Sequence, residues 1–197
     1  FALLAALMRQ RRACCAPELV SPRTKVPSAK LEAFMQLVDE LRDGGHRALV
    51  FSQFVDLLAL VRRDLDARGI PYRYLDGSTS PKQREREVAS FQDGEGDLFL
   101  ISLKAGGTGL NLTAADYVVH LDPWWNPAAE DQASDRAHRI GQTRPVTVYR
   151  LVLQGSVEEK ILAIHDQKRS LAEGLLADAD DADVRVDLET LERLLRD

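Results

Sequence analysis

The sequence contains little that could cross-link the chain or bind a metal ion. Its two cysteines, Cys14 and Cys15, are adjacent, so they lack the C-x-x-C spacing of zinc and redox sites, and a disulfide between them would be strained. Neither His120 nor His138 has a Cys or His companion at metal-ligand spacing. We therefore predict a reducing environment and no metal site made of protein ligands alone.

Long apolar runs are also missing. The opening segment FALLAALM is too short, and too soon followed by arginines, to span a bilayer, so we expect no membrane segment. Because the chain begins with Phe rather than Met, we interpret its N-terminus as a position inside a longer polypeptide. With 45% hydrophobic and 29% charged residues, the composition is that of one globular domain with terminal appendages.

The motifs of a complete nucleotide-hydrolysing site are absent too. No G-x-x-x-x-G-K-[ST] phosphate loop occurs, and no Asp-Glu pair ends an apolar strand where it could hold magnesium. No cysteine or serine has a paired histidine that the sequence identifies as its base. Taken alone, the chain is therefore an incomplete active site for nucleotide chemistry.

The acidic excess is confined to one end of the chain. The formal net charge is −5, and residues 177–197 contain eight acids and three bases, which leaves residues 1–176 neutral. The first thirty residues carry six bases and one acid. A neutral body with segregated charge can still present a basic groove, so composition leaves nucleic-acid binding open.

Segments with strand and helix patterns alternate along most of the chain. The expected strands are residues 47–51, 72–75, 97–102, 116–121 and 146–152. The expected helices are residues 1–16, 28–43, 55–68, 81–92, the segment after Pro127, 156–176 and a short one at 188–195. Ser28 and Ser80 are the predicted N-caps of two of them. This alternation predicts an α/β fold with a parallel sheet covered by helices on both faces.

Four polar segments follow the expected strands, at the edge where open parallel sheets bind ligands. They are Ser52–Gln53, Asp76–Gly77, Ser102–Gly109 and Asp122–Asn126. In the third, glycines 106, 107 and 109 let backbone N–H groups approach a phosphate, while Lys104 adds charge and Thr108 a hydroxyl. Glycine turns are also common without any ligand, so this loop alone does not decide the function.

A helix with spaced arginines is expected after Pro127. Gln132, Arg136 and Arg139 are at i, i+4 and i+7, so they would lie on one face of that helix. Arginine suits a developing phosphoryl charge because its planar fork stays ionised and binds oxygens in pairs. The alternative is a salt-bridged surface formed with the nearby acidic residues Glu130, Asp131 and Asp135. Asp135 could also hold Arg139 in position, which would make both interpretations true.

Both tryptophans of the chain, Trp124 and Trp125, lie just before that helix. At most one of two adjacent tryptophans faces inward easily. We expect Trp124 to be buried and Trp125 to be available for stacking on a nucleotide.

Six segments, in chain order, resemble the Swi/Snf-type double-stranded DNA translocases of helicase superfamily two. They are SAKLEA, VFSQF, LDGSTS, SLKAGGTGLNLT, DPWWNP and QASDRAHRIGQ, and the resemblance spans residues 1 to about 176. It implies a RecA-like C-terminal helicase lobe with helical appendages at both ends. The implied divisions are an N-terminal helix and linker (1–27), the RecA-like domain (28–155), a brace helix (156–176), and an acidic linker with a short helix (177–197).

The resemblance also implies roles for named residues. Arg136 and Arg139, supported by Gln132, would reach ATP that is bound with Mg²⁺ mainly on an N-terminal RecA-like lobe of the same polypeptide. We assign further ATP contacts to Gly107, Gly109 and Asp135. Contacts with double-stranded DNA are assigned to Ser52, Gln53, Lys104, Thr108 and Trp125.

Two departures and two rival functions accompany this prediction. Ala16 replaces a frequent histidine of the family, and the acidic tract after Leu176 is not a family motif. The rivals are a non-enzymatic scaffold that binds a partner through its acidic tail, and a lobe of an RNA helicase.

We expect the complete polypeptide to be a DNA-dependent ATPase, and this chain to be inactive without the first lobe. Its expected location is the bacterial cytoplasm, at the nucleoid, or the eukaryotic nucleus.

Overall fold

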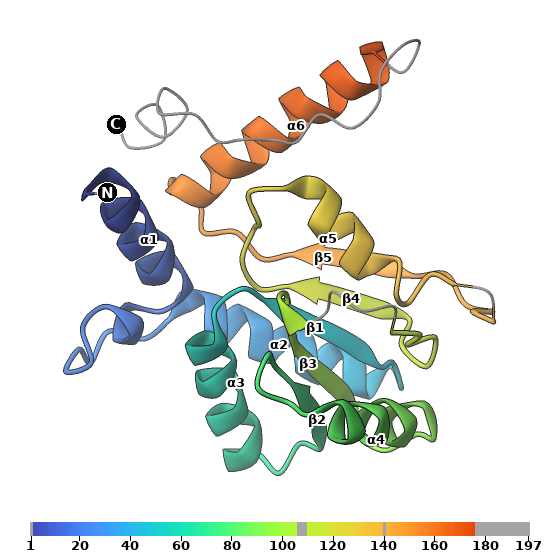
Figure 1. The fold of residues 1–197 in the computed structure, drawn as a ribbon. Helices are drawn as coiled ribbons and strands as arrows, with labels where there is room; N and C mark the ends of the chain where they lie inside the picture. Colours follow the sequence, from blue (N-terminus) through green and yellow to red (C-terminus); the bar gives the residue numbers. More distant parts are fainter. Residues whose placement is uncertain (1, 106–109, 140, 176–197) are drawn as a thin grey trace.

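The computed structural model describes residues 2–105, 110–139 and 141–175, and the side chains up to residue 166 (Figure 1). One five-stranded sheet lies at its centre, in the order β2-β3-β1-β4-β5, and every neighbouring pair is parallel. The strands are β1 (Ala48–Ser52), β2 (Tyr72–Leu75), β3 (Leu98–Ser102), β4 (Tyr117–His120) and β5 (Thr147–Arg150). The predicted α/β class and all five predicted strands are thus confirmed.

Six α-helices surround or extend this sheet in the described part of the chain. They are α1 (Ala2–Cys15), α2 (Ala29–Asp43), α3 (Val55–Ala67), α4 (Pro81–Gln92), α5 (Pro127–Ser134) and α6 (Val157–Leu175), with a 3₁₀ turn η1 (Pro17–Leu19) after α1. Both predicted caps are confirmed: Ser28 Oγ accepts the Leu31 N–H at 3.2 Å, and Ser80 Oγ accepts the Gln83 N–H at 3.3 Å. The predicted helix at 188–195 lies outside the described residues.

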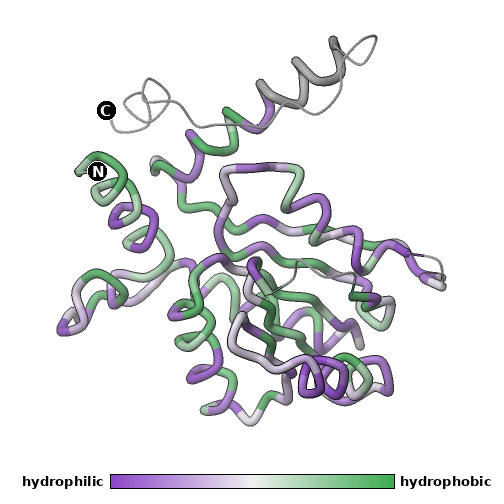
Figure 2. The backbone as a smooth tube through the Cα atoms, in the orientation of Figure 1, coloured by the Kyte–Doolittle hydropathy of each residue, from purple (hydrophilic) through white to green (hydrophobic). Residues whose placement is uncertain are grey.

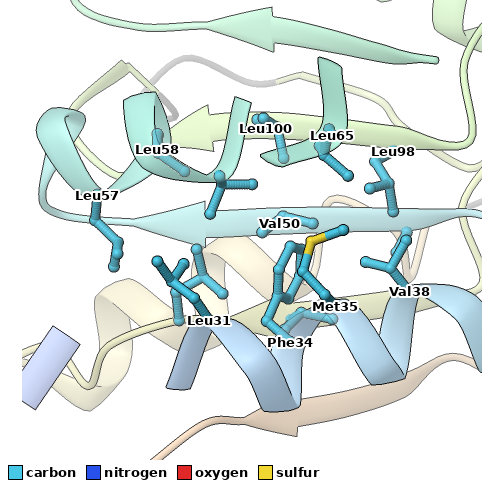
Figure 3. Close-up of a cluster of buried hydrophobic side chains, with 14 of the residues drawn as sticks. Leu31, Phe34, Met35, Val38, Val50, Leu57, Leu58, Leu65, Leu98 and Leu100 are labelled. Carbon is cyan, nitrogen blue, oxygen red and sulfur yellow. The ribbon is translucent and has the colours of Figure 1, made fainter. Parts of the chain in front are cut away.

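Alternate residues of the central strand face opposite sides of the sheet, as strand geometry requires. Ala48 and Val50 of β1 pack against α2 and α3. Figure 3 shows this layer, in which side chains of both helices meet Val50 and the β3 residues Leu98 and Leu100. This cluster contains most of the large buried apolar residues of α2 and α3, so it fixes both helices on one face.

The opposite face is covered by α4 and α5. Leu49 and Phe51 of β1 pack there with Phe91 of α4 and Ala133 of α5. In Figure 2 the central strands β1 and β3 are mainly hydrophobic while α4 is mainly hydrophilic, which agrees with Phe91 being the buried residue of that helix. Phe91 therefore docks α4 on the sheet, as predicted.

The coverage is incomplete at β5, which forms one edge of the sheet. Val148 and Tyr149 are exposed there, with relative accessibilities of 36% and 41%. The predicted helical cover on both faces of the sheet is thus incomplete at this edge strand, which α5 reaches through the ion pairs of Glu130 and Asp131 with Arg150. The prediction holds for β1 and β3, whose residues are all buried.

The helices α1 and α6 lie side by side beyond the sheet (Figure 1). They pack through a small cluster of Leu7, Val157 and Ile161, against which Trp125 also rests. No helix in the described ranges is long and apolar enough to cross a membrane.

Candidate functional site

The loops that follow β1, β3 and β4 meet at one edge of the sheet because these neighbouring strands are parallel and in register. Ser52 of β1 is paired with Ser102 of β3, and Phe51 with His120 of β4. The predicted contact residues Gln53, Lys104 and Trp125 follow these strand ends. The predicted residues Gly107, Thr108 and Gly109 lie outside the described residues.

Ser52 faces the interior at this edge. It is fully buried, its hydroxyl donates to Asp122 Oδ1 at 2.5 Å, and it accepts the Phe54 N–H at 2.9 Å. Direct contact between the Ser52 side chain and a phosphate is therefore not available in this conformation. Ser52 instead holds the carboxylate of Asp122 beside the end of β1.

Asp122 joins the loops after β1 and β4. It is buried, its Oδ1 also accepts the Gln53 N–H at 3.3 Å, and its Oδ2 lies 3.9 Å from Arg11 Nη2. Burial raises the pKa of Asp122 to about 6, although the Ser52 hydrogen bond and the Arg11 and Lys30 charges oppose that rise. At neutral pH the carboxylate is thus ionised, with Oδ1 held by two donors at the end of β1 and Oδ2 beside the Arg11 charge.

The two tryptophans are not arranged as predicted, because both are half-buried. Trp125 packs against the α1–α6 cluster, and the Arg11 guanidinium lies 4.6 Å from its ring centroid. The backbone N–H of Trp124 donates to Oε1 of the buried Glu130 at 2.7 Å. The expectation that Trp124 is buried is therefore wrong. The docking of α1 beside this loop covers part of Trp125 and leaves part of it accessible, so its contact with nucleic acid stays a prediction. Lys104, by contrast, is exposed.

The predicted single helix face with Gln132, Arg136 and Arg139 is also wrong. The helix α5 ends at Ser134, and the chain continues in a tighter turn in which the Ala137 N–H donates to the Ser134 carbonyl at 3.1 Å. A tertiary bond from the Leu112 N–H to the Arg136 carbonyl, at 3.1 Å, anchors this turn to the preceding loop. As a result, Gln132 and Arg139 are exposed whereas Arg136 is buried.

Arg136 is a buried cation with unused donors. It is 4% exposed, and its Nε and Nη1 have no hydrogen-bond partner in the described part of the chain. Its pKa is lowered by burial and, further, by the charges of Arg139 and Arg84. Three guanidiniums therefore concentrate positive charge at one place, which an anion would stabilise. The predicted ATP contact Asp135 is the exposed C-cap residue of α5 beside this site.

His120 has a structural role at the end of β4. Its Nε2 lies 3.0 Å from Ser134 Oγ, and because that hydroxyl donates to the Glu130 carbonyl, the histidine is the donor in this pair. Burial lowers the pKa of His120 to about 4, so the ring is neutral at physiological pH. The described residues contain no group of three or more Cys, His, Asp or Glu residues that could hold a metal ion.

Sequence reasoning missed three buried charged residues that surround this edge: Arg11, Lys30 and Glu158. Lys30 Nζ donates to Glu158 at 2.5 and 2.7 Å and to the Leu121 carbonyl at 2.8 Å, which joins α2 and α6 to the end of β4. The sequence contains a signal for the burial of one of them, because Arg11 is four residues from both Leu7 and Cys15 on the buried side of α1. A charge at a position where helical periodicity requires an apolar residue indicates a buried ion pair.

The fold and this cationic edge define a class of protein. Residues 29–141 match the family model described as "Helicase conserved C-terminal domain". The molecule is therefore a RecA-like helicase lobe of the C-terminal type.

Similar proteins narrow that class. The DNA repair protein RAD5A of Arabidopsis thaliana is 40% identical over 163 residues, which cover 82% of this chain and 16% of the relative. The chromatin-remodeling ATPase INO80 of Aspergillus oryzae is 49% identical over 135 residues, 68% of this chain and 9% of the relative. The solved SWI2/SNF2 ATPase core of Sulfolobus solfataricus in complex with dsDNA aligns with a TM-score of 0.75 at 32% identity, covering 98% of this chain and 41% of that one.

The chain belongs to the SWI2/SNF2 family, and corresponds to the C-terminal helicase lobe of its members. It spans a fifth or less of the length of the curated relatives that it matches. The relatives include proteins named as ATP-dependent helicases and ATPases, so ATP use is a property of the family.

Proposed function

We propose that this chain is the second motor lobe of an ATP-dependent double-stranded DNA translocase. Arg136 and Arg139 would act on ATP bound to an N-terminal lobe of the same polypeptide, and the loops after β1, β3 and β4 would hold the DNA backbone. The observation that carries this proposal is the buried Arg136, with two donors unpartnered in the described residues, beside the charges of Arg84 and Arg139.

A buried guanidinium without a counter-charge is costly, and an anion that approaches from outside the lobe removes that cost. The γ-phosphate of ATP supplies such an anion when the two lobes close. Arginines offered across an interface in this way accelerate phosphoryl transfer by about three to five orders of magnitude. Gln132 and Asp135 lie close enough in sequence to support the two arginines.

The DNA contact is proposed for Gln53, Lys104 and Trp125, with the glycine loop after Ala105. These residues belong to loops at one sheet edge, and the similar Sulfolobus core is named as a complex with dsDNA. Contacts to phosphates carry no base information, so binding should be sequence-independent and salt-sensitive. Mg²⁺ is assigned to the first lobe, because it is usually held by carboxylates together with the nucleotide phosphates.

The test is ATP hydrolysis by the full-length polypeptide with no nucleic acid, with duplex DNA and with single-stranded RNA. We expect duplex DNA to stimulate hydrolysis strongly and single-stranded RNA to have little effect. Stimulation by RNA instead would establish the RNA helicase, and no hydrolysis under any of the three conditions would establish the scaffold. The 197-residue chain alone is expected to be inactive in the same assay.

A further inference from the structure

Arg11 of α1 connects that helix to two of the three loops that are proposed to hold DNA, those after β1 and β4. We infer that Arg11 is a positioning residue, which orients Gln53 as a hydrogen-bond donor and fixes the Trp125 ring for contact with the DNA backbone. The inference rests on the proposed function, since it assigns a purpose to residues proposed there as DNA contacts.

Arg11 is only 1% exposed, although it belongs to a helix at the periphery of the fold. Its Nη1 donates to Gln53 Oε1 at 3.1 Å, and its Nη2 donates to the Pro123 carbonyl. Asp122, 3.9 Å away, supplies the counter-charge. Burying a guanidinium is favourable only when its donors and charge are satisfied, so this set of partners determines where α1 can lie.

The contact with Gln53 decides which way its amide faces. A guanidinium has donors only, so the amide oxygen of Gln53 must face Arg11 and its NH₂ group must face away. That Nε2 is itself buried and has no hydrogen-bond partner in the described part of the chain, so it is an unsatisfied donor that a phosphate oxygen entering the loop after β1 would satisfy. Arg11 therefore leaves Gln53 with an unused donor, which is the polarity that a phosphate oxygen requires.

The same guanidinium lies against the aromatic ring of Trp125, at 4.6 Å from the centroid, and at 5.6 Å from that of Phe54. A flat guanidinium can donate to two acceptors in its plane while its face lies on a ring, whereas a lysine ammonium is a point charge with neither a flat face nor a fixed fork. The arrangement is thus specific for arginine and not for positive charge alone.

Leu7 and Cys15 are buried on the same side of α1 as Arg11, so the helix is held as a unit. A displacement of α1 would withdraw Arg11 from the loops after β1 and β4 together. The position of α1, which precedes the sheet in the chain, is in this way coupled to the DNA contacts at the sheet edge.

The test measures ATP hydrolysis by the full-length polypeptide as duplex DNA is titrated. Arg11→Lys keeps the charge but loses the fork, and Arg12→Lys is a matched control one residue along α1, where the side chain is 36% exposed and pairs with Asp56. We expect Arg11→Lys to raise the half-saturating DNA concentration about tenfold, the size expected for one charge-assisted hydrogen bond. The rate at saturating DNA should change less than twofold, and Arg12→Lys should match the wild type.

Two further variants separate positioning from a general loss of structure. If Arg11 acts through Gln53, the double variant Arg11→Lys, Gln53→Ala should have the same half-saturating DNA concentration as Gln53→Ala alone. Gln53→Glu keeps an acceptor for Arg11 but has no donor, so it should weaken DNA dependence at least as much as Gln53→Ala. Three results would overturn the inference. They are effects of the two substitutions on the half-saturating DNA concentration that multiply in the double variant, a wild-type value for Gln53→Glu, and equal values for Arg11→Lys and Arg12→Lys. A wild-type enzyme that duplex DNA does not stimulate would instead overturn the proposed function.

Discussion

Arg136 and Arg139 are three residues apart but lie in opposite environments, because Arg136 is buried in the turn after α5 and Arg139 is exposed. The two guanidiniums are nevertheless near enough for the charge of Arg139 to lower the pKa of Arg136. A buried arginine can be preorganised by the lobe itself, while an exposed one can move toward a ligand that arrives from another lobe. Both are therefore retained in the proposed contact with ATP.

We predict that Arg139→Ala abolishes DNA-stimulated ATP hydrolysis by the full-length polypeptide, with a loss of about a thousandfold or more. Duplex DNA affinity should stay within about twofold, since the residue is assigned to the nucleotide and not to the DNA backbone. Arg68→Ala is the control: Arg68 is also partly exposed, caps α3 at the opposite edge of the sheet and pairs with Asp39. A normal rate of ATP hydrolysis by Arg139→Ala would contradict the proposed role of Arg139 as an arginine finger.

Two buried titrating groups should give the folded chain opposing responses to pH. The pKa of Asp122 is raised from its ordinary 3.8 to about 6, so its contribution to stability is present below pH 4 and lost as pH rises to 6. The pKa of His120 is lowered from 6.5 to about 4, so its contribution is present above pH 6.5 and lost as pH falls to 4. Each amounts to about 3 kcal/mol over its range.

The two contributions should largely cancel in the wild-type chain between pH 4 and 6. We predict that Asp122→Asn makes the free energy of unfolding rise more steeply with pH, and that His120→Gln makes it fall. Urea unfolding of the 197-residue chain at several pH values measures both slopes. Variants that keep the wild-type slope would show that these groups titrate normally in the folded chain.

Residue types and spacing predicted which loops lie together at the strand ends, but not which side chains face outward. Ser52 and Gln53 were singled out because they follow an apolar strand, yet only the structure shows that Ser52 turns inward to Asp122. The partners of Arg11 are 42 and 112 residues away in the chain. Such long-range hydrogen bonds leave no local pattern beyond a charge at an apolar position.

At the scale of elements, the strands and most helices were predictable because their signals are local. The caps at Ser28 and Ser80 and the apolar stripe of α2 depend on neighbours within one or two turns. The end of α5 was not predictable, because the Leu112–Arg136 backbone bond that anchors the following turn is tertiary. The exposure of β5 was missed for the same reason, since strand order decides which strand is at the edge.

The start of α6 is held by a buried ion pair rather than by apolar packing alone. Glu158 is 1% exposed and accepts from Lys30 and from the Leu153 N–H at 2.9 Å. Removal of one partner from such a pair leaves an uncompensated charge in the interior. The position of α6 should therefore depend on Glu158 more than on any exposed residue of its first turn.

We predict that Glu158→Gln lowers the free energy of unfolding by about 3 kcal/mol or more and speeds hydrogen exchange in the first turns of α6. The neighbouring Glu159→Gln is the control, because Glu159 is exposed, and it should cost less than about 0.5 kcal/mol. Lys30→Met combined with Glu158→Gln should recover part of the loss. Equal effects of the two glutamate variants would contradict the anchoring role of the ion pair.

For the molecule as a whole, the net charge has the same sign as the proposed ligand. The chain carries −5 overall, with the excess in residues 177–197 and a neutral remainder. Attraction between net charges therefore cannot drive binding to DNA, which is itself an anion. In the proposed DNA contact, attraction by this lobe would come from a few cations at the strand ends, and this limits the number of phosphates that the lobe can neutralise.

Salt titration of duplex binding tests that limit. We predict that log affinity of the nucleotide-free full-length polypeptide falls linearly with log salt concentration, and that Lys104→Ala reduces the slope by about 1, as expected for one lost phosphate contact. Lys25→Ala removes the same charge from the exposed connector before α2, which contains none of the proposed DNA contacts, and should leave the slope unchanged. The loss of affinity caused by Lys104→Ala should be equal for GC-rich and AT-rich duplexes, since a phosphate contact carries no base information. A loss that depends on base sequence, or an equal change of slope in both lysine variants, would remove Lys104 from the DNA contact and leave Gln53 and Trp125 to account for it.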